Sequence, residues 1–216
     1  MLIMTKTIKW RIAANIFIVL ATVTGLLMMF FWKYGMLLAD GLTNFRYFTV
    51  LSNVFGGVTA AVWLVLAAIC KGKAEDIPRA VELLKYMAAV SLGLTFITVM
   101  GFFGPLYGYL NMLMSANFFF HLTIPLAAMA EFILLNQRKM SMKNCIVSML
   151  PMLLYGTVYL TYNLMMGKSE DPFQYDWYGF LLWGLPVGMG IFAGICAVTF
   201  LVGTLLRLLN KKIRQL

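Results

Sequence analysis

Long apolar runs separated by short polar connections dominate the chain. Six such runs can be marked, at 12–32, 45–70, 83–103, 112–135, 146–166 and 180–206. Because an α-helix rises about 1.5 Å per residue, each run is long enough to cross a hydrocarbon layer of about 30 Å. The pattern predicts an all-α integral membrane protein, with residues 1–216 forming a single domain, a bundle of six transmembrane helices.

The composition supports this class and excludes others. Apolar residues make up 62% of the chain and charged residues 12%, against roughly 45–50% and about 25% in soluble domains. Such a sequence is neither a soluble domain nor a disordered chain. Since six spans leave no room for a sizeable soluble domain, any active or binding site must lie inside the bundle.

Basic residues are unevenly distributed over the connections. Of the 17 Lys and Arg residues, 14 lie near the two termini and in the even-numbered loops, and the other three are Lys33, Arg46 and Lys168. Basic residues favour the cytoplasmic side, so both termini are predicted to be cytoplasmic. The net charge of +9 is interpreted as a set of topology signals at the lipid surface, and no nucleic-acid partner is expected. If the protein is bacterial, the membrane that holds it would be the plasma membrane.

The cysteines and glycines predict little chemistry. The cysteines are Cys70, Cys145 and Cys196. They form neither a CxxC pair nor a metal-ligand spacing with the one histidine, so no disulfide framework, metal site or cofactor is expected. In the sixth run, Gly184 and Gly188, like Gly190 and Gly194, are spaced to let two helices approach closely. Packing within the chain and a homodimer through this run are the two interpretations.

Ionisable side chains inside the apolar runs are candidates for function, because each costs about 2.5 to 3.5 kcal/mol at a helix centre in lipid. His121 lies in the middle of the fourth run, and Glu131 lies nearer its cytoplasmic end. Glu131 is close enough to the surface to snorkel or to pair with a cation, which favours a structural role. For His121, the alternatives are an imidazole satisfied by a backbone carbonyl or a hydroxyl, and a catalytic group.

Small and polar residues recur at helical spacing in two runs. In the second run they are Thr49, Ser52, Asn53, Gly56 and Ala60. In the fourth run, Asn117 and Ala128 share the face of His121. Stripes of this kind face protein rather than lipid, and a simple packing seam is one explanation of them. The rise per residue places Thr49 about 6 Å and His121 about 14 Å below the outer ends of their spans, both in the outer half.

These stripes raise the hypothesis of a nucleophile and a base, since a neutral histidine can take the proton of a threonine hydroxyl. Thr49 and His121 would form that pair. Acyl transfer also needs donors for the developing oxyanion, or contacts to the substrate, and the candidates are Arg46, Asn53 and Asn117. No carboxylate stands where it would evidently orient the imidazole. The candidates for a third member are Asp40, Asp171, Asp176, Tyr159 and Tyr162.

Three segments carry a resemblance to a known family. They are Phe45 to Asn53, His121 to Pro125, and Tyr155 to Tyr162 leading to Asp171-Pro172-Phe173. In order and spacing they resemble six-span bacterial proteins related to the androgen-induced and androgen-dependent TFPI-regulating membrane proteins. The resemblance implies that a membrane-embedded threonine and histidine hydrolyse fatty acid esters of hydroxy fatty acids. These residues fall on Thr49 and His121. The chain departs from the family pattern where Asp171, rather than an aromatic residue, precedes the proline.

The leading hypothesis is therefore a membrane-embedded hydrolase of lipid esters with a threonine nucleophile and a histidine base. Its partner is a membrane lipid or fatty acyl ester substrate. One alternative is a small proton-coupled transporter or channel, in which His121 and Glu131 lie along a path through Asn53 and Asn163. Another is a non-catalytic lipid-binding protein in which the stripes serve packing only.

Overall fold

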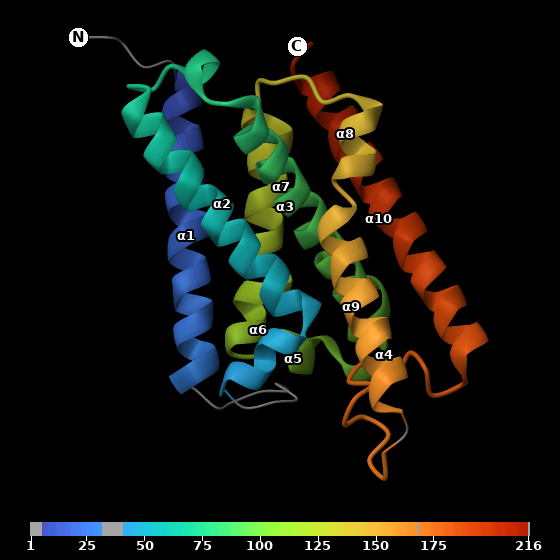
Figure 1. Cartoon of the computed structure of the whole chain (residues 1–216). Helices are drawn as coiled ribbons and strands as arrows, with labels where there is room; N and C mark the ends of the chain where they lie inside the picture. Colours follow the sequence, from blue (N-terminus) through green and yellow to red (C-terminus); the bar gives the residue numbers. More distant parts are fainter. Residues whose placement is uncertain (1–5, 32–40, 168, 216) are drawn as a thin grey trace.

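The structure, a computed structural model, describes residues 6–31, 41–167 and 169–215. Helices make up most of these residues, and no strand occurs among them (Figure 1). Six helical stretches are long and apolar enough to cross a membrane, which supports a multi-pass membrane protein. Three residues of the topology and site predictions, Lys33, Asp40 and Lys168, lie outside the described ranges.

Each predicted run overlaps one of these stretches. They are α1 (Lys6–Phe31), α2 (Phe48–Ile69), Arg79–Tyr107 (α3 Arg79–Thr98, η3 Val99–Phe103, α4 Gly104–Tyr107), Ala116–Leu135 (α6 Ala116–Phe118, η4 Phe119–Thr123, α7 Ile124–Leu135), Met142–Met166 (α8 Met142–Val147, α9 Leu150–Met166) and α10 (Leu185–Ile213). The short elements between them are η1 (Gly41–Arg46), η2 (Ala74–Asp76) and α5 (Tyr109–Met112).

Several predicted boundaries were wrong. The first, third and fifth stretches begin earlier than expected, at Lys6, Arg79 and Met142. For α3 the reason is Pro78, which precedes Arg79 and fits the start of a helix but not its interior. Conversely, residues 45–47, 112–115 and 180–184 were predicted to be membrane-spanning but lie outside the six stretches. Apolar character alone does not decide where a helix begins when the flanking loops are apolar too.

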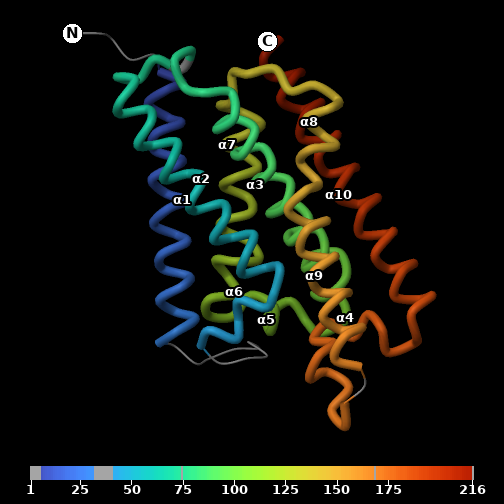
Figure 2. Tube along the Cα trace, viewed as in Figure 1, coloured from blue at the N-terminus to red at the C-terminus, as the bar shows by residue number. Residues whose placement is uncertain are grey.

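Helices α1, α2, α3 and α7 form the packed centre of the bundle, and α8, α9 and α10 cover one side of it (Figure 1). The start of α1 and the end of α10 lie at the same end of the molecule (Figure 2). We call the opposite end, where α2 and α6 begin, the distal end. Towards it, α10 is drawn apart from α9 (Figures 1 and 2).

Small residues allow the central helices to approach closely. Ser52, Asn53, Gly56 and Ala60 of the predicted stripe are all buried, as expected for a face turned towards protein. A Cβ added at Gly56 would overlap Leu92 of α3. The stripe therefore sets the distance between α2 and α3.

Two glycines of α10 behave differently, whereas a Cβ added at Gly188 would overlap Leu181. A Cβ added at Gly190 or at Gly194 would have no atom within 4 Å, so this pair does not serve close packing within the described chain. Of the two interpretations offered for the pair, packing within the chain does not fit. The homodimer stays a prediction.

Two basic residues are buried inside the bundle, in the half nearest the termini. The interpretation of all basic residues as signals at the lipid surface is therefore wrong for these two. Arg11 of α1 and Lys85 of α3 are only 2% and 3% exposed. The Arg11 guanidinium donates to both carboxylate oxygens of Glu82, at 2.8 and 2.5 Å, and to Glu131 Oε1 at 2.6 Å. Glu131 thus pairs with a neighbouring cation, as its structural interpretation predicted.

Two further side chains complete this arrangement. Asn15 accepts a hydrogen bond from Lys85 Nζ at 2.6 Å, and Trp63 donates its indole N–H to Glu82 at 3.1 Å. Lys85 Nζ also lies 3.5 Å from Glu131 Oε2. We call Arg11, Glu82, Lys85 and Glu131 the charge cluster. It joins α1, α3 and α7 and holds two positive and two negative side chains, so that its formal charges balance.

Candidate functional site

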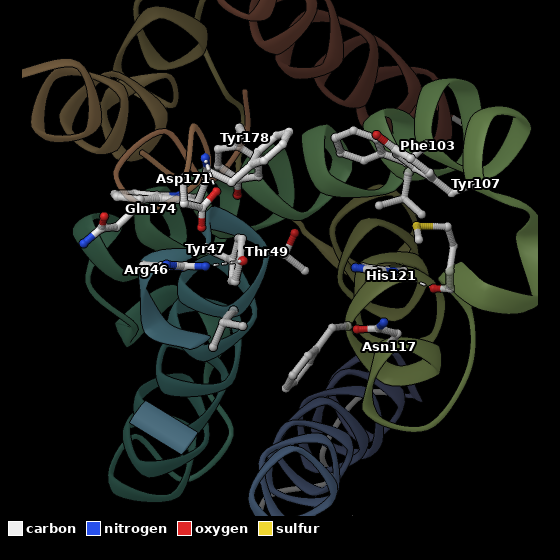
Figure 3. Close-up of a pocket in the computed structure, with 16 residues that line it drawn as sticks. Arg46, Tyr47, Thr49, Phe103, Tyr107, Asn117, His121, Asp171, Gln174 and Tyr178 are labelled. Carbon is white, nitrogen blue, oxygen red and sulfur yellow. Dashed lines mark hydrogen bonds between the residues drawn. The ribbon is translucent and has the colours of Figure 1, made fainter. Parts of the chain in front are cut away.

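A cavity of about 660 Å³ lies at the distal end of the bundle. Helix α2 and the residues before it contribute Arg46 and Thr49 to its wall, and the α6–η4 segment contributes Asn117 and His121. The segment between α9 and α10 covers the cavity with residues that include Asp171, Gln174 and Tyr178 (Figure 3). This main cavity therefore gathers four of the five residues that the sequence offered as nucleophile, base, or contacts to the oxyanion or substrate, and Asn53 is the exception.

Thr49 stands in the first turn of α2. Tyr47 is the N-cap and Phe48 the first helical residue, so Thr49 lies about 2 Å along the axis rather than about 6 Å below the end of the span. The predicted depth was wrong because residues 45–47 do not continue the helix. The start of a helix carries partial positive charge, which favours a negative charge developing near Thr49. The neighbouring N–H groups of Phe48 and Val50 are already bonded, to the Tyr178 hydroxyl at 2.8 Å and to Tyr47 O at 3.1 Å.

His121 lies in η4, a π-helical turn. Ile124 N–H donates to the carbonyl of Phe119, five residues earlier, instead of to that of Phe120. In this register, the partner of the Phe120 carbonyl would be the N–H of residue 125, but Pro125 has none. Because α6 begins at Ala116 rather than at residue 112, His121 lies about 8 Å along the axis from the start of the helix, against the predicted 14 Å.

Asn53 takes up the carbonyl that Pro125 leaves free. Its side-chain Nδ2 donates to Phe120 O at 2.9 Å and to Thr49 O at 2.7 Å. Both of its N–H donors are thereby used, and Asn53 does not line the main cavity. The structure thus places it behind the site, where it fastens the backbone of Thr49 to the residue before His121. Sequence reasoning considered it as part of a packing seam, as a contact to the oxyanion or to the substrate, and as part of a transport path, but not as a bridge between these two carbonyls.

The His121 ring is held by a backbone carbonyl. Its Nδ1 lies 2.6 Å from Met112 O, and the residue is only 8% exposed. A carbonyl oxygen can only accept, so Nδ1 carries the hydrogen, and a neutral ring then keeps the lone pair on Nε2. Met112 O therefore fixes the tautomer that can act as a base. No spacing of side chains could have indicated this partner, because it belongs to the backbone.

Thr49 and His121 face one another across the main cavity (Figure 3). Among the described residues, no hydrogen bond joins their side chains. The space between them is therefore part of the site, and a proton that passes from one to the other must be relayed or must wait for the groups to close around a ligand. Catalytic hydrogen bonds are often long in the unliganded state.

Asp171 and Asp176, two of the described candidates for a third member, lie apart from the imidazole. Asp176 accepts hydrogen bonds from the backbone N–H groups of Phe180 and Leu181, at 3.0 and 2.8 Å, and from the Tyr159 hydroxyl. It therefore anchors the segment that covers the cavity. Asp171 does line the cavity, but on the same side as Arg46 and opposite His121 (Figure 3).

Arg46 presents a guanidinium to the main cavity. It donates to the Tyr47 hydroxyl at 2.9 Å and lies 5.7 Å from the centre of the Trp177 ring. Its Nε is buried without a hydrogen-bond partner in the described part of the chain. Asn117 also lines the cavity and is 2% exposed. Of the three candidates for contacting substrate or oxyanion, Arg46 and Asn117 therefore border the cavity.

Aromatic hydroxyls connect the covering segment to α2. Tyr178 accepts from the backbone N–H of Phe48 at 2.8 Å, and burial raises the pKa of its hydroxyl well above the ordinary value. Tyr155 donates to Arg46 O at 2.6 Å and accepts from the Trp177 indole at 3.0 Å. This network positions the start of α2, and with it Thr49, but it combines segments too far apart in sequence to be predicted from spacing.

Glu131 does not border the main cavity, and its carboxylate belongs to the charge cluster. The described residues therefore do not bring Glu131 and His121 together, as the transporter alternative requires. Comparisons with protein-family models, curated proteins and solved structures found no match.

Proposed function

We propose that this protein is a membrane-embedded hydrolase of lipid esters, with Thr49 as nucleophile and His121 as general base. The observation that supports the proposal most strongly is that both side chains border one cavity while Met112 O holds the imidazole by Nδ1. This arrangement provides a hydroxyl, a proton acceptor and room for a substrate between them.

In the first half of the reaction, Thr49 Oγ attacks the ester carbonyl carbon and its proton passes to His121 Nε2. A water molecule in the space between the two side chains relays this proton. The tetrahedral intermediate places its oxyanion near the start of α2, and Arg46 and Asn117, which border the same cavity, are the candidate donors to it. The bond to the alcohol oxygen then breaks, and His121 returns the proton to that oxygen, leaving an acyl-threonine.

In the second half, water attacks the acyl-threonine and gives a proton to His121. The bond between the acyl carbon and Thr49 Oγ breaks, and the proton returns to Thr49 as the fatty acid leaves. All protons and electron pairs are thereby accounted for. The reaction requires no metal or cofactor.

The substrate class in this proposal comes from the resemblance to the androgen-induced and androgen-dependent TFPI-regulating membrane proteins, of which this chain would be a bacterial relative. It is a fatty acid ester of a hydroxy fatty acid. With both termini cytoplasmic, the distal cavity lies in the outer leaflet of the plasma membrane. Such an ester reaches the site sideways from the bilayer.

Labelling with an acyl-reactive probe tests the nucleophile. Purified protein in lipid nanodiscs is treated with a fluorophosphonate, and the adduct is located by mass spectrometry. We expect the adduct on Thr49, with loss of ester hydrolysis in proportion to labelling. The Thr43→Ala variant, which removes an exposed threonine of η1, is the matched control and should label like the wild type. An adduct on another residue, or a protein that hydrolyses no ester and instead carries pH-dependent flux in liposomes, would contradict the proposal.

Removing the Asn53 bridge should reduce kcat without removing any reacting group. Asn53→Leu loses both hydrogen bonds that fasten Thr49 to Phe120, and a misplacement of about 1 Å can lower a rate about 10²-fold. We expect a decrease of this order in kcat with KM within a few-fold of wild type. Asn53→Gln, which keeps the amide on a longer side chain, should recover part of the loss. If Asn53→Leu and Asn53→Gln lose kcat equally, and the amount of folded protein falls to the same extent, Asn53 serves stability only.

A further inference from the structure

A second, smaller cavity continues from Thr49 into the bundle. Its volume is about 90 Å³, and it shares Thr49, Val99, Phe103 and Tyr178 with the main cavity. From there it passes between α3, α9 and α10, where Leu94, Met152 and Phe192 contribute to its wall. We call this cavity the slot. Thr49 lies where the two cavities meet.

Most of the hydroxyls in the wall of the slot are bonded within the protein. Besides Thr49, only Thr98 has a hydroxyl there without a hydrogen bond to a described residue. Thr95 is bonded to Ser52 at 3.0 Å, Tyr155 donates to Arg46 O, and Tyr159 donates to Asp176. Tyr178 accepts from the Phe48 backbone. Because these hydroxyls are satisfied within the protein, a ligand in the slot gains little from polar atoms and much from apolar surface.

The charged and amide side chains belong to the main cavity only. Arg46, Asn117, Asp171 and Gln174 border the main cavity, and none of them borders the slot. A molecule that extends from one cavity to the other past Thr49 therefore needs a polar part and an apolar part joined close to that hydroxyl. This is the layout of an ester, whose acyl chain and alcohol portion diverge from one carbonyl.

Phe192 closes part of the slot against α9. A Cβ added at Gly156 would overlap the Phe192 ring, so the two helices meet here in direct contact. Phe192 and Ile195 are only half-buried, and on α9 Val158 is 68% exposed, so this side of the bundle faces the bilayer. A volume of about 90 Å³ corresponds to roughly three water molecules, which is room for the first few carbons of a chain.

We propose that the slot is the acyl-chain subsite, which binds the carbons next to the ester carbonyl while the alcohol portion occupies the main cavity. The rest of the chain passes Phe192 towards the bilayer. This inference rests on the proposed function for its chemistry, but it makes a separate statement about binding. Gly156 and Phe192 are then the residues that determine acyl-chain selectivity.

Chain-length profiles test the subsite by kinetics. The purified protein is assayed with p-nitrophenyl esters from acetyl to palmitoyl, in which only the acyl part varies. We expect kcat/KM of the wild type to rise over the first carbons and then to level off. The ratio of kcat/KM for long-chain esters to kcat/KM for the acetyl ester measures acyl-chain selectivity. Gly156→Ala, whose methyl displaces Phe192, should lower this ratio about tenfold, because one methylene in an apolar pocket changes a rate about 10-fold or more. Phe192→Ala should raise the ratio. Leu201→Ala, an exposed position of α10 outside the slot, should keep the wild-type profile.

Photocrosslinking tests the subsite without turnover. The Thr49→Ala protein in nanodiscs is irradiated with a fatty acyl ester that carries a diazirine near the carbonyl. Adducts on α9 or α10 are expected, and adducts on the Asp171 to Gln174 segment or on α6 would overturn the proposal. A competition experiment uses a phospholipid that carries a diazirine. If this phospholipid labels the slot and excess ester does not reduce the labelling, the slot holds a bilayer lipid and the proposal is overturned.

The two assays separate the subsite from the catalytic assignment. A wild type that hydrolyses esters while the acyl chain crosslinks elsewhere contradicts the subsite alone. A protein that hydrolyses no ester but crosslinks the chain on α9 or α10 supports the subsite and contradicts the hydrolase. Unchanged chain-length profiles in both Gly156→Ala and Phe192→Ala would contradict the assignment of acyl-chain selectivity to these two residues.

Discussion

Alanine at Thr49 or at His121 is expected to lower kcat for ester hydrolysis about 10³-fold or more, because a nucleophile and its base act as one unit. The Thr49 side chain makes no hydrogen bond to another described residue, so its removal leaves no buried partner unsatisfied. His121→Ala loses the hydrogen bond to Met112 O, which contributes about 1 kcal/mol to the free energy of unfolding. Both variants should therefore remain folded.

The double variant makes this prediction sharper. Since each single change already disables the pair, Thr49→Ala combined with His121→Ala should be no slower than the slower single variant. Rates are measured on purified protein, with thermal unfolding in the same detergent as the control for folding. Turnover near the wild-type rate in either single variant, or losses that multiply in the double variant, would show that the two residues do not act together.

Breaking the charge cluster is expected to have the largest effect on stability. Glu131→Gln leaves Arg11 and Lys85, both almost completely buried, with one carboxylate instead of two. Removing one partner of a buried ion pair typically costs about 3–5 kcal/mol. We therefore expect Glu131→Gln to lower the free energy of unfolding by about this amount, measured in mixed micelles. Lys139→Met, which removes an exposed cation, is the control and should stay near wild type.

A compensating change should recover much of the loss. Adding Lys85→Met to Glu131→Gln balances the formal charges of the cluster again, with Arg11 still paired with Glu82. The double variant should thus be more stable than the sum of the two single changes predicts, which is the sign of direct coupling. Additive losses would show that the four charges are energetically independent. The cluster does not border the main cavity, so variants that fold should keep their ester specificity.

The charge cluster also shows where prediction from sequence reached its limit. Arg11 and Lys85 follow the same charge rule as the basic residues of the loops, and the sequence places both near the ends of apolar runs. The available signal was helical spacing, since Arg11 and Asn15 share one helix face, as do Glu82 and Lys85. That signal shows which residues share a face, but not that the faces of α1, α3 and α7 meet.

The site was anticipated to a similar extent. The stripes on the second and fourth runs correctly indicated faces turned towards protein, and Thr49 and His121 do border one cavity. The role of Asn53 was not anticipated, because it depends on a carbonyl that Pro125 leaves free in a π-helical turn. Pro125, four residues after His121, was the visible sign that the backbone near the histidine is irregular.

The sequence by itself determined the class of the protein and its six spans, because the length and polarity of a run decide whether it can lie in a bilayer. It also determined which faces of α2 and of the fourth span are buried, because helical periodicity is a local property. Only the tertiary structure decided that Met112 O holds the imidazole, that the charges of α1, α3 and α7 pair, and that Thr49 stands between a polar cavity and an apolar slot. The contact of Met112 with His121 depends on the break between α5 and α6, which the apolar run did not reveal. The other contacts join residues from separate helices, and how helices pack depends on the fit of many side chains at once, which no single segment encodes.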